Sequence, residues 1–185
     1  MKTYKELSEM LGSLYDLDDM SHFYDDSKVE GSSKTSRKQI AGAMKKIPWE
    51  KGESNFDVGG GKFNLSTKQL ATYGVTNFIY DPYNRGKAHN KIALRMSDEC
   101  KTSTIMNVLN VIPELRVRLD VIRQAKRART EEIYISVYEG KKTGVGGQTR
   151  DGWQNHRELI EYLPEVKKIY PQAKIWKYGM IRVLI

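Results

Sequence analysis

A run of three glycines behind a short apolar stretch is the first feature of the sequence that could bind a ligand. Gly59, Gly60 and Gly61 follow Asp57 in the segment DVGGGKF, and apolar residues at helical spacing begin a few residues later. Glycine lets the backbone turn sharply and lets a ligand approach without a Cβ in the way. A helix that begins after such a turn offers N–H groups to an anion. The segment therefore predicts a strand–turn–helix site for a nucleotide-like ligand.

A second carboxylate, that of Asp81, has the position in the sequence that is typical of a ribose-binding acid. Asp81 ends the next predicted strand, 24 residues after Asp57, and an acid placed in this way accepts hydrogen bonds from ribose hydroxyls. The chain has neither GxxxxGK[ST] nor a complete GxGxxG at this turn, so a single nucleoside-like ligand fits better than a dinucleotide. The alternative is that the glycine turn serves only helix–sheet packing and that Asp81 caps the next helix.

Strands and helices alternate along the segments that must position these residues. Strands are predicted at 55–58, 75–81, 102–112 and 131–140, with a hairpin over 174–185, and helices at 65–73, 87–97, 114–129 and 153–170. We expect Pro164 to bend the last helix and 141–152 to form a glycine-rich loop. Alternation of this kind is typical of an α/β fold with a largely parallel sheet, to which the last hairpin adds an antiparallel edge.

These motifs together resemble the class I S-adenosylmethionine-dependent methyltransferases, in which D-x-G-x-G follows one strand and an acid ends the next. The combination of DVGGGKF, YDPYNR, NVLNVI and VYEG...TGVGGQTRDGWQNH looks like a small group of predicted methyltransferases common in bacteriophages. The terminal pair KIWKYG and MIRVLI resembles the antiparallel edge of that fold. The resemblance covers residues 55–185, and residues 1–50 lie outside it.

The resemblance implies a Rossmann-like methyltransferase sandwich and S-adenosylmethionine as the cofactor. The implied cofactor-binding residues are Asp57, Gly59, Gly60, Gly61, Asp81, Pro82 and Asn107. Only 22 residues separate Asp81 from Thr104, which is room for one helix where the family has more. We therefore expect a sheet reduced in the region 86–101, with Asp98 or Glu99 as candidates on the adenine side.

Polar residues at the ends of the later strands are the candidates for catalysis. Asn107 and Asn110 interrupt an apolar run, and Tyr138 ends the strand that follows. A buried Asn needs hydrogen-bond partners, which at this edge are the cofactor, an acceptor amine or, alternatively, loop backbone. YDPYNR could instead be the [DN]PP[YF] loop of amino-directed DNA methyltransferases, but Tyr83 replaces its second proline. Cys100 precedes its strand, which argues against a cysteine nucleophile.

Basic and aromatic residues concentrate in the loops that follow the strands. They could meet the phosphates and bases of a nucleic acid, or Trp153 could only staple a helix start. The candidates for substrate binding are Arg85, Lys141, Lys142, Arg150, Trp153, Gln154 and Asn155.

Charge divides the chain of 185 residues unequally. Residues 1–30 hold 3 basic and 8 acidic groups and have a net charge of −5, while the whole chain has a net charge of +8. We expect residues 1–50 to be an acidic helical or flexible appendage and 51–185 the methyltransferase-like domain. One cysteine and three scattered histidines predict no disulfide and no metal site. The sequence shows no signal peptide and no membrane span, which predicts a cytoplasmic protein.

Two functions follow from these features. The first is an S-adenosylmethionine-dependent methyltransferase that acts on nucleic acid. The second is a non-catalytic or cofactor-consuming phage relative that binds S-adenosylmethionine, or a host protein, to counter host defence. A plain nucleic-acid-binding protein on a vestigial fold is a further alternative.

Overall fold

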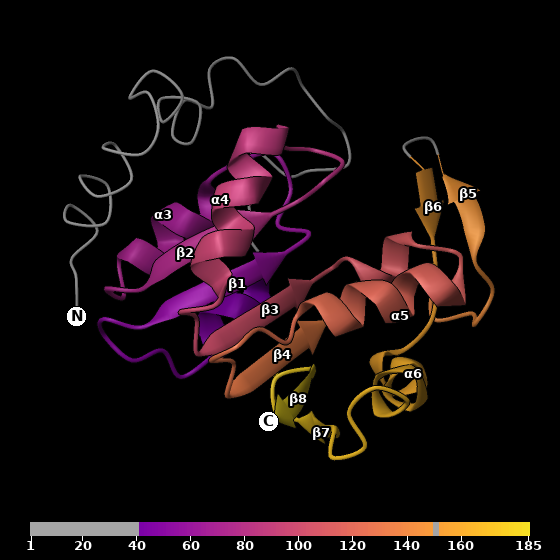
Figure 1. Cartoon of the computed structure of the whole chain (residues 1–185). Helices are drawn as coiled ribbons and strands as arrows, with labels where there is room; N and C mark the ends of the chain where they lie inside the picture. Colours follow the sequence, from indigo (N-terminus) through magenta and orange to yellow (C-terminus); the bar gives the residue numbers. More distant parts are fainter. Residues whose placement is uncertain (1–40, 150–151) are drawn as a thin grey trace.

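Four parallel strands form the greater part of the central sheet. The computed structural model describes residues 41–149 and 152–185 (Figure 1). The sheet has the order β2-β1-β3-β4-β8-β7. The parallel strands are β1 (Ser54–Val58), β2 (Thr76–Tyr80), β3 (Thr102–Met106) and β4 (Glu132–Ser136). β8 (Met180–Leu184) runs antiparallel to β4, and β7 (Lys174–Trp176) antiparallel to β8. This confirms the predicted α/β class with an antiparallel edge pair, and it is compatible with a Rossmann-like fold.

Helices cover both faces of the sheet. α3 (Leu65–Ala71) links β1 to β2, α4 (Lys87–Ser97) links β2 to β3, and α5 (Leu115–Gln124) links β3 to β4. α6 (Leu163–Lys167) precedes the terminal hairpin. In the described residues α4 is the only helix between β2 and β3, and no strand lies there, as the short spacing predicted.

The face under α4, α5 and α6 is apolar, and we call it the apolar face. Phe56, Ile105 and Ile133 from three neighbouring strands are fully buried there against Ile122 of α5 and Val166 of α6. Alternation along the strands explains this, because every second side chain points to the same side of a sheet. This layer holds most of the hydrophobic core.

The opposite face, under α3, is polar at its centre, and we call it the polar face. Asn55, Asp57, Asn77 and Thr104 are buried there among one another. Hydrophobic side chains flank this layer on the same side of the sheet, where Leu70, Met44, Ile47, Tyr134 and Met180 form two further clusters. Met44 and Ile47 therefore pack on the folded sheet, while residues 1–40 of the predicted appendage lie outside the described residues.

Two predicted elements differ from the structure. β3 ends at Met106 and not at Ile112, because Asn107 has a φ of 59° and the chain then forms a 3₁₀ helix at Leu109–Val111. The helix predicted from residue 153 begins only at the 3₁₀ helix Leu159–Tyr162, and Pro164 lies in the first turn of α6 and does not bend it. The glycine-rich loop contains a small hairpin of β5 (Gly147–Thr149) and β6 (Gly152–Gln154).

Candidate functional site

The candidate site lies where the parallel strands end, and we call this the carboxyl edge. β2 pairs with one side of β1 and β3 with the other, so the connections after β1 and β3 leave in opposite directions. Ligands of open α/β sheets bind at such a switch point. Three of the predicted residues directly follow a strand at this edge: Asp81 follows β2, Gly59 follows β1 and Asn107 follows β3, in this order across the sheet.

The glycine turn has the backbone shape that its sequence predicts. Gly59 and Gly61 have φ values of 75° and 79°, a region that favours glycine. A Cβ on Gly60 would lie 2.5 Å from Oδ2 of Asp57, and one on Gly59 would lie 2.6 Å from Cγ2 of Val108. The turn therefore needs glycine for its conformation and for its close packing, and Val108 covers Gly59 from the side of β3.

The Asp81 carboxylate is buried and holds two loops together. Its Oδ1 accepts the N–H groups of Tyr83 and Asn84 at 3.1 and 3.0 Å. Its Oδ2 accepts the Gly61 N–H at 3.0 Å and the Asn84 side-chain amide at 2.9 Å. Four donors match the acceptor capacity of a carboxylate. Asp81 lies where the ribose hypothesis needs an acid, but in this conformation its oxygens are engaged by the protein.

Arg85 gives these loops a second connection. Its Nε donates to the Gly61 carbonyl at 2.7 Å, and its Nη1 donates to the Asn64 side chain at 2.8 Å. The side chain predicted to meet substrate phosphates is thus a link between the glycine turn and the β2 loop. Pro82, next to Asp81, is exposed. His89 lies under this loop, where its Nε2 donates to the Ile79 carbonyl at 2.8 Å and burial, together with the Arg85 charge, lowers its pKa to about 4.

Asp57 lies below the turn and points into the polar face. The hydroxyls of Thr104 and Ser66 donate to its two oxygens, each at 3.0 Å. Burial raises the pKa of this carboxyl, and the hydroxyl donors offset part of the increase. Ser66 belongs to the first turn of α3. Asp57 therefore fixes α3 and the turn before it, and its carboxylate does not reach the surface.

Asn107 and Tyr138 are the catalytic candidates that the structure leaves open to solvent. Asn107 is exposed directly after β3, and its N–H donates to the Ser136 carbonyl at 2.9 Å. Tyr138 is 63% exposed two residues after the end of β4. Because Asn107 is bonded to the last residue of β4, the two side chains belong to neighbouring loops on the carboxyl edge. An acceptor group presented at this edge could contact both.

The third catalytic candidate, Asn110, belongs to a buried polar cluster with the predicted substrate residues Gln154 and Asn155. Asn110 Nδ2 donates to Gln154 Oε1 at 3.2 Å, and the Asn155 N–H donates to the Asn110 carbonyl at 2.6 Å. Gln154 Nε2 also donates to the Tyr138 carbonyl at 3.1 Å. These bonds fasten the β5–β6 hairpin to the loops after β3 and β4, beyond which it stands in Figure 1. The cluster positions the edge and is closed to a substrate.

The remaining substrate candidates lie on or beside this hairpin. Trp153 is partly buried, and its Nε1 donates to Asn155 Oδ1 at 2.7 Å. Lys141 and Lys142 are exposed, and Lys142 makes an ion pair of 2.7 Å with Glu139, which lowers the pKa of that carboxyl. Arg150 lies outside the described residues. Val108 and Asn84 were not among the sequence-predicted site residues. The contact of Val108 with Gly59 joins loops that follow different strands and leaves no local pattern. Asn84 lies three residues after Asp81 in the same loop, so the spacing of Asp81 and Asn84 was a local signal for their bond.

The adenine-side candidates Asp98 and Glu99 lie at the opposite edge of the sheet. They follow α4 and precede β3, where they make ion pairs of 3.1 Å with Arg127 and 2.8 Å with Arg129. They are therefore not placed beside the glycine turn. Cys100 is buried at the same edge, and burial raises its pKa to about 12, which leaves a protonated thiol at neutral pH.

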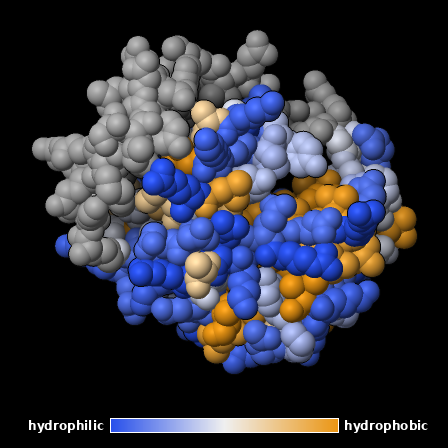
Figure 2. All heavy atoms as spheres, in the orientation of Figure 1, coloured by the Kyte–Doolittle hydropathy of each residue, from blue (hydrophilic) through white to orange (hydrophobic). Residues whose placement is uncertain are grey.

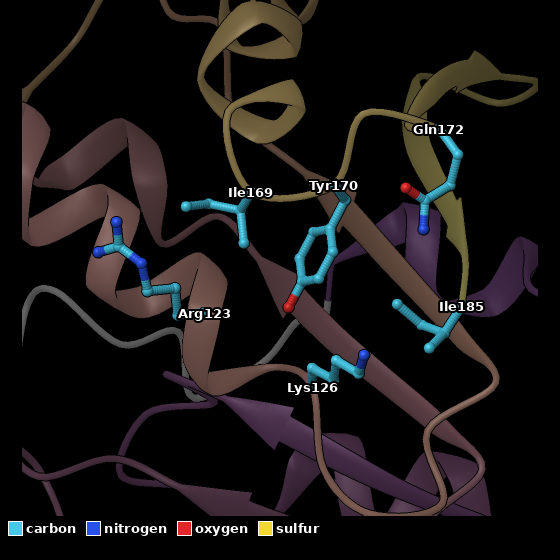
Figure 3. A pocket seen from close by; sticks show the side chains of 6 residues that line it. All are labelled: Arg123, Lys126, Ile169, Tyr170, Gln172 and Ile185. Carbon is cyan, nitrogen blue, oxygen red and sulfur yellow. The ribbon is translucent and has the colours of Figure 1, made fainter.

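An open pocket of about 430 Å³ also lies away from the glycine turn. Figure 3 shows the Tyr170 ring at its centre, with Arg123 of α5 on one side, Gln172 and Ile185 on the other, and Lys126, which follows α5, below the ring. The Tyr170 hydroxyl donates to the Ile122 carbonyl at 3.2 Å, and burial raises its pKa to about 12. The pocket opens where β8 ends, so it is separate from the carboxyl edge.

No protein family matches the sequence, and no characterised protein is detectably similar to it. Among residues 41–149 and 152–185, no three His, Cys, Asp or Glu side chains come together as a metal site. In the same residues no helix has the length and apolar character to span a bilayer. Hydrophilic residues cover most of the described surface in the view of Figure 2.

Proposed function

We propose that the protein is an S-adenosylmethionine-dependent methyltransferase that acts on nucleic acid. The observation that supports this most is the glycine turn at the switch point, where Gly59 and Gly61 both have positive φ and Gly61 is bonded to the acid that ends β2. The mostly parallel sheet with an antiparallel edge pair is compatible with the fold that this activity uses. The sequence motifs of the turn, the β2 end and the terminal hairpin point to the same family.

The residues present fit such a ligand in part. The backbone of Gly59–Gly61 lets a ligand approach closely, because glycine has no Cβ. Gly59 and Gly60 are partly exposed and lie beside Asn107 along the carboxyl edge. Asp81 fits only if its Oδ2 exchanges the Asn84 amide for a ribose hydroxyl, since its other bonds are to backbone N–H groups that hold the loops. Bound at this edge, S-adenosylmethionine would supply an electrophilic methyl group.

The chain's own residues would position the acceptor. Asn107 and Tyr138 present an amide and a phenol at the edge, and both can hold an amine or a hydroxyl by hydrogen bonds. Transfer to a neutral nucleophile depends mainly on such positioning. The Asn110–Gln154–Asn155 cluster keeps the two loops in register.

Calorimetric titration with S-adenosylmethionine and S-adenosylhomocysteine tests the cofactor site. We expect binding by the wild type, and a loss of about 1–3 kcal/mol in Asp81→Asn, which removes a charge-assisted acceptor. Asn84→Ala should keep or improve the affinity, since it frees Asp81 Oδ2. Asp120→Asn, an exposed acid on α5, is the matched control. No binding by folded wild-type protein would refute the proposal.

One observation favours a second function. Four donors from the protein engage Asp81 and Val108 lies against Gly59, so a cofactor would have to displace contacts that the protein already makes, which favours a non-catalytic relative. The alternative is a methyltransferase-like protein that binds the cofactor or a host protein without methyl transfer. Incubation with S-adenosylmethionine labelled in the methyl group, together with DNA, RNA and host protein, separates the two: label in a macromolecule supports the enzyme, and cofactor binding with no transfer supports the alternative.

A further inference from the structure

The turn between β7 and β8 carries aromatic rings and lysines at the carboxyl edge. Lys177, Tyr178 and Gly179 form this turn. It precedes β8, whose Ile181 pairs with Ile135 near the end of β4, so the turn lies beyond Ser136. β8 lies two strands from β3, or roughly 10 Å at ordinary strand spacing. The turn is therefore on the side of the molecule where Asn107 and Tyr138 are exposed.

The rings form a row that begins in the core. The buried Tyr134 lies 5.3 Å from Trp176 between ring centroids, and Trp176 lies 5.9 Å from Tyr178, in edge-to-face arrangements. Tyr178 ends the row and is 52% exposed. Two buried or half-buried rings thus support an exposed one, which makes a rigid platform for a planar group.

Tyr178 also has a backbone conformation that disfavours its side chain. Its φ is 64°, in the left-handed region where a residue with a Cβ costs about 1–2 kcal/mol and where glycine or asparagine is the usual choice. Half of the side chain is open to water, so burial repays this cost only partly. Strained residues with exposed functional groups concentrate at ligand sites.

Lysines surround the exposed ring. Lys46 Nζ lies 5.0 Å from the centroid of Tyr178, and Lys177 Nζ lies 5.2 Å from it and 5.1 Å from the centroid of Trp176. Lys45 stands next to Lys46 and is exposed. Among the described residues no carboxylate forms a salt bridge with these three lysines. The patch therefore combines a stacking surface with lysines that pair with no carboxylate of the described residues.

We propose that Tyr178, with Trp176, Lys46 and Lys177, is a binding site for single-stranded nucleic acid. A base stacks on Tyr178, and the ammonium groups that it displaces from the ring neutralise the neighbouring phosphates. Base–aromatic stacking accepts any base, and it needs unpaired bases because a duplex hides their faces. Nucleic acid as the partner rests on the proposed function, but the site itself needs no S-adenosylmethionine.

Fluorescence anisotropy with a labelled oligothymidylate and a matched duplex, without cofactor, tests this site. Tyr178→Asn should lower the affinity for the single strand about 5- to 150-fold, while Tyr178→Phe keeps it within about twofold. The midpoint temperature of Tyr178→Asn should equal or exceed that of the wild type, since asparagine tolerates the backbone conformation. A merely structural tyrosine would give the reverse pattern, with lower thermal stability and unchanged binding.

The lysines and a matched tyrosine complete the experiment. Lys46→Gln and Lys177→Gln should each reduce the slope of log affinity against log salt by about 0.7. Tyr73, a 38% exposed tyrosine before β2 at the opposite edge, is the control, and Tyr73→Asn should bind as the wild type does. The proposal is wrong if the wild type does not bind the single strand at low salt or if Tyr178→Asn binds it unchanged. Single-strand binding without cofactor binding would contradict only the proposed methyltransferase.

Discussion

The two faces of the sheet solve the problem of burial in different ways. Ile105 and Thr104 are neighbours in β3 and equally buried, but Ile105 packs into the apolar face and Thr104 into the polar face. The apolar face gains stability from area removed from water. The polar face uses directed bonds among Asn55, Asp57 and Thr104, which contribute less net energy but fix the position of α3 and the glycine turn. The side of the sheet that supports the site is therefore the less stabilising and the more specific one.

The largest effect is expected where the apolar side carries a charge. Arg118, which is 5% exposed, makes two bonds to Glu165, and Arg157 makes a third. Burial would raise the pKa of Glu165, but the two arginines outweigh it and hold the pKa below its usual value. Glu165→Ala should cost about 3–5 kcal/mol, because it leaves Arg118 buried without its partner.

Urea denaturation measures this loss. Glu161→Ala, which removes a more exposed partner of Arg157, is the control and should cost about 1 kcal/mol or less. Arg118→Met combined with Glu165→Met should recover much of the stability. An equal loss in the Glu161 and Glu165 variants would show that burial does not set the strength of this pair.

Neighbouring substitutions in β3 compare the two faces directly. Ile105→Ala should cost about 2–5 kcal/mol through a cavity in the apolar face. Thr104→Val keeps the shape but removes the bonds to Asp57 and Asn55, and should cost about 1–3 kcal/mol. Chemical denaturation of both variants gives the two losses in the free energy of unfolding. If Thr104→Val cost more than Ile105→Ala, the ranking of the two faces would be wrong.

The glycine turn is the point where the polar face meets the site. Gly59→Ala should cost about 1–3 kcal/mol, since it adds the strain of a positive φ and a contact of 2.6 Å with Val108. Val108→Ala in the same chain should relieve the contact and leave the strain. Gly86→Ala is the matched control, because nothing lies within 4 Å of a Cβ there and its φ is −64°. Thermal melting of the wild type, the two single variants and the double variant separates the cost of the backbone strain from that of the contact.

The smallest effect is a pH dependence that originates in Asp57. Burial raises the folded pKa above the ordinary 3.8, so folding favours the protonated acid. Its stabilising contribution is complete below pH 3.8 and is lost as the pH rises through the folded pKa. The free energy of unfolding of the wild type should therefore fall relative to that of Asp57→Asn, by at most about 1.4 kcal/mol per pH unit. A difference that does not change with pH would contradict the raised pKa.

Local patterns predicted the elements that alternate in β1, α3, β2 and α4, because apolar spacing and the turn at Gly74 act over short distances. They also placed Asp81 at the end of a strand and Gly59–Gly61 in a turn. They missed the end of β3, where the apolar spacing continues although Asn107 adopts a positive φ. They also predicted a helix over 153–158, which is wrong. The bonds of Gln154 to Asn110 and Tyr138 hold this segment in another conformation, and they join residues too far apart in sequence for a local pattern to show them.

The hydrogen-bond partners of the site residues depend on tertiary structure even more than the bounds of the helices and strands do. The donors to Asp81 include Gly61, which lies on another loop. Arg85 was predicted to face phosphates because it lies in a loop that follows a strand, and the sequence near it does not show that it reaches Gly61. Residue type and position along a strand thus predicted where the candidate site lies. They could not predict which of its groups the protein itself occupies, since this depends on how neighbouring loops fold over one another.

The place of β8 in the sheet has a consequence for how the chain is made. Of the six strands, β8 is the last to be synthesised, yet it lies between β4 and β7. Until residues 180–184 have left the ribosome, one backbone edge of β4 has no strand to pair with, and Ile133 and Ile135 lack their neighbours Val183 and Ile181. An unpaired apolar strand edge can pair with another chain. A nascent chain that stalls before residue 180 should therefore depend on chaperones, whereas a chain that includes residues 180–184 closes this edge itself.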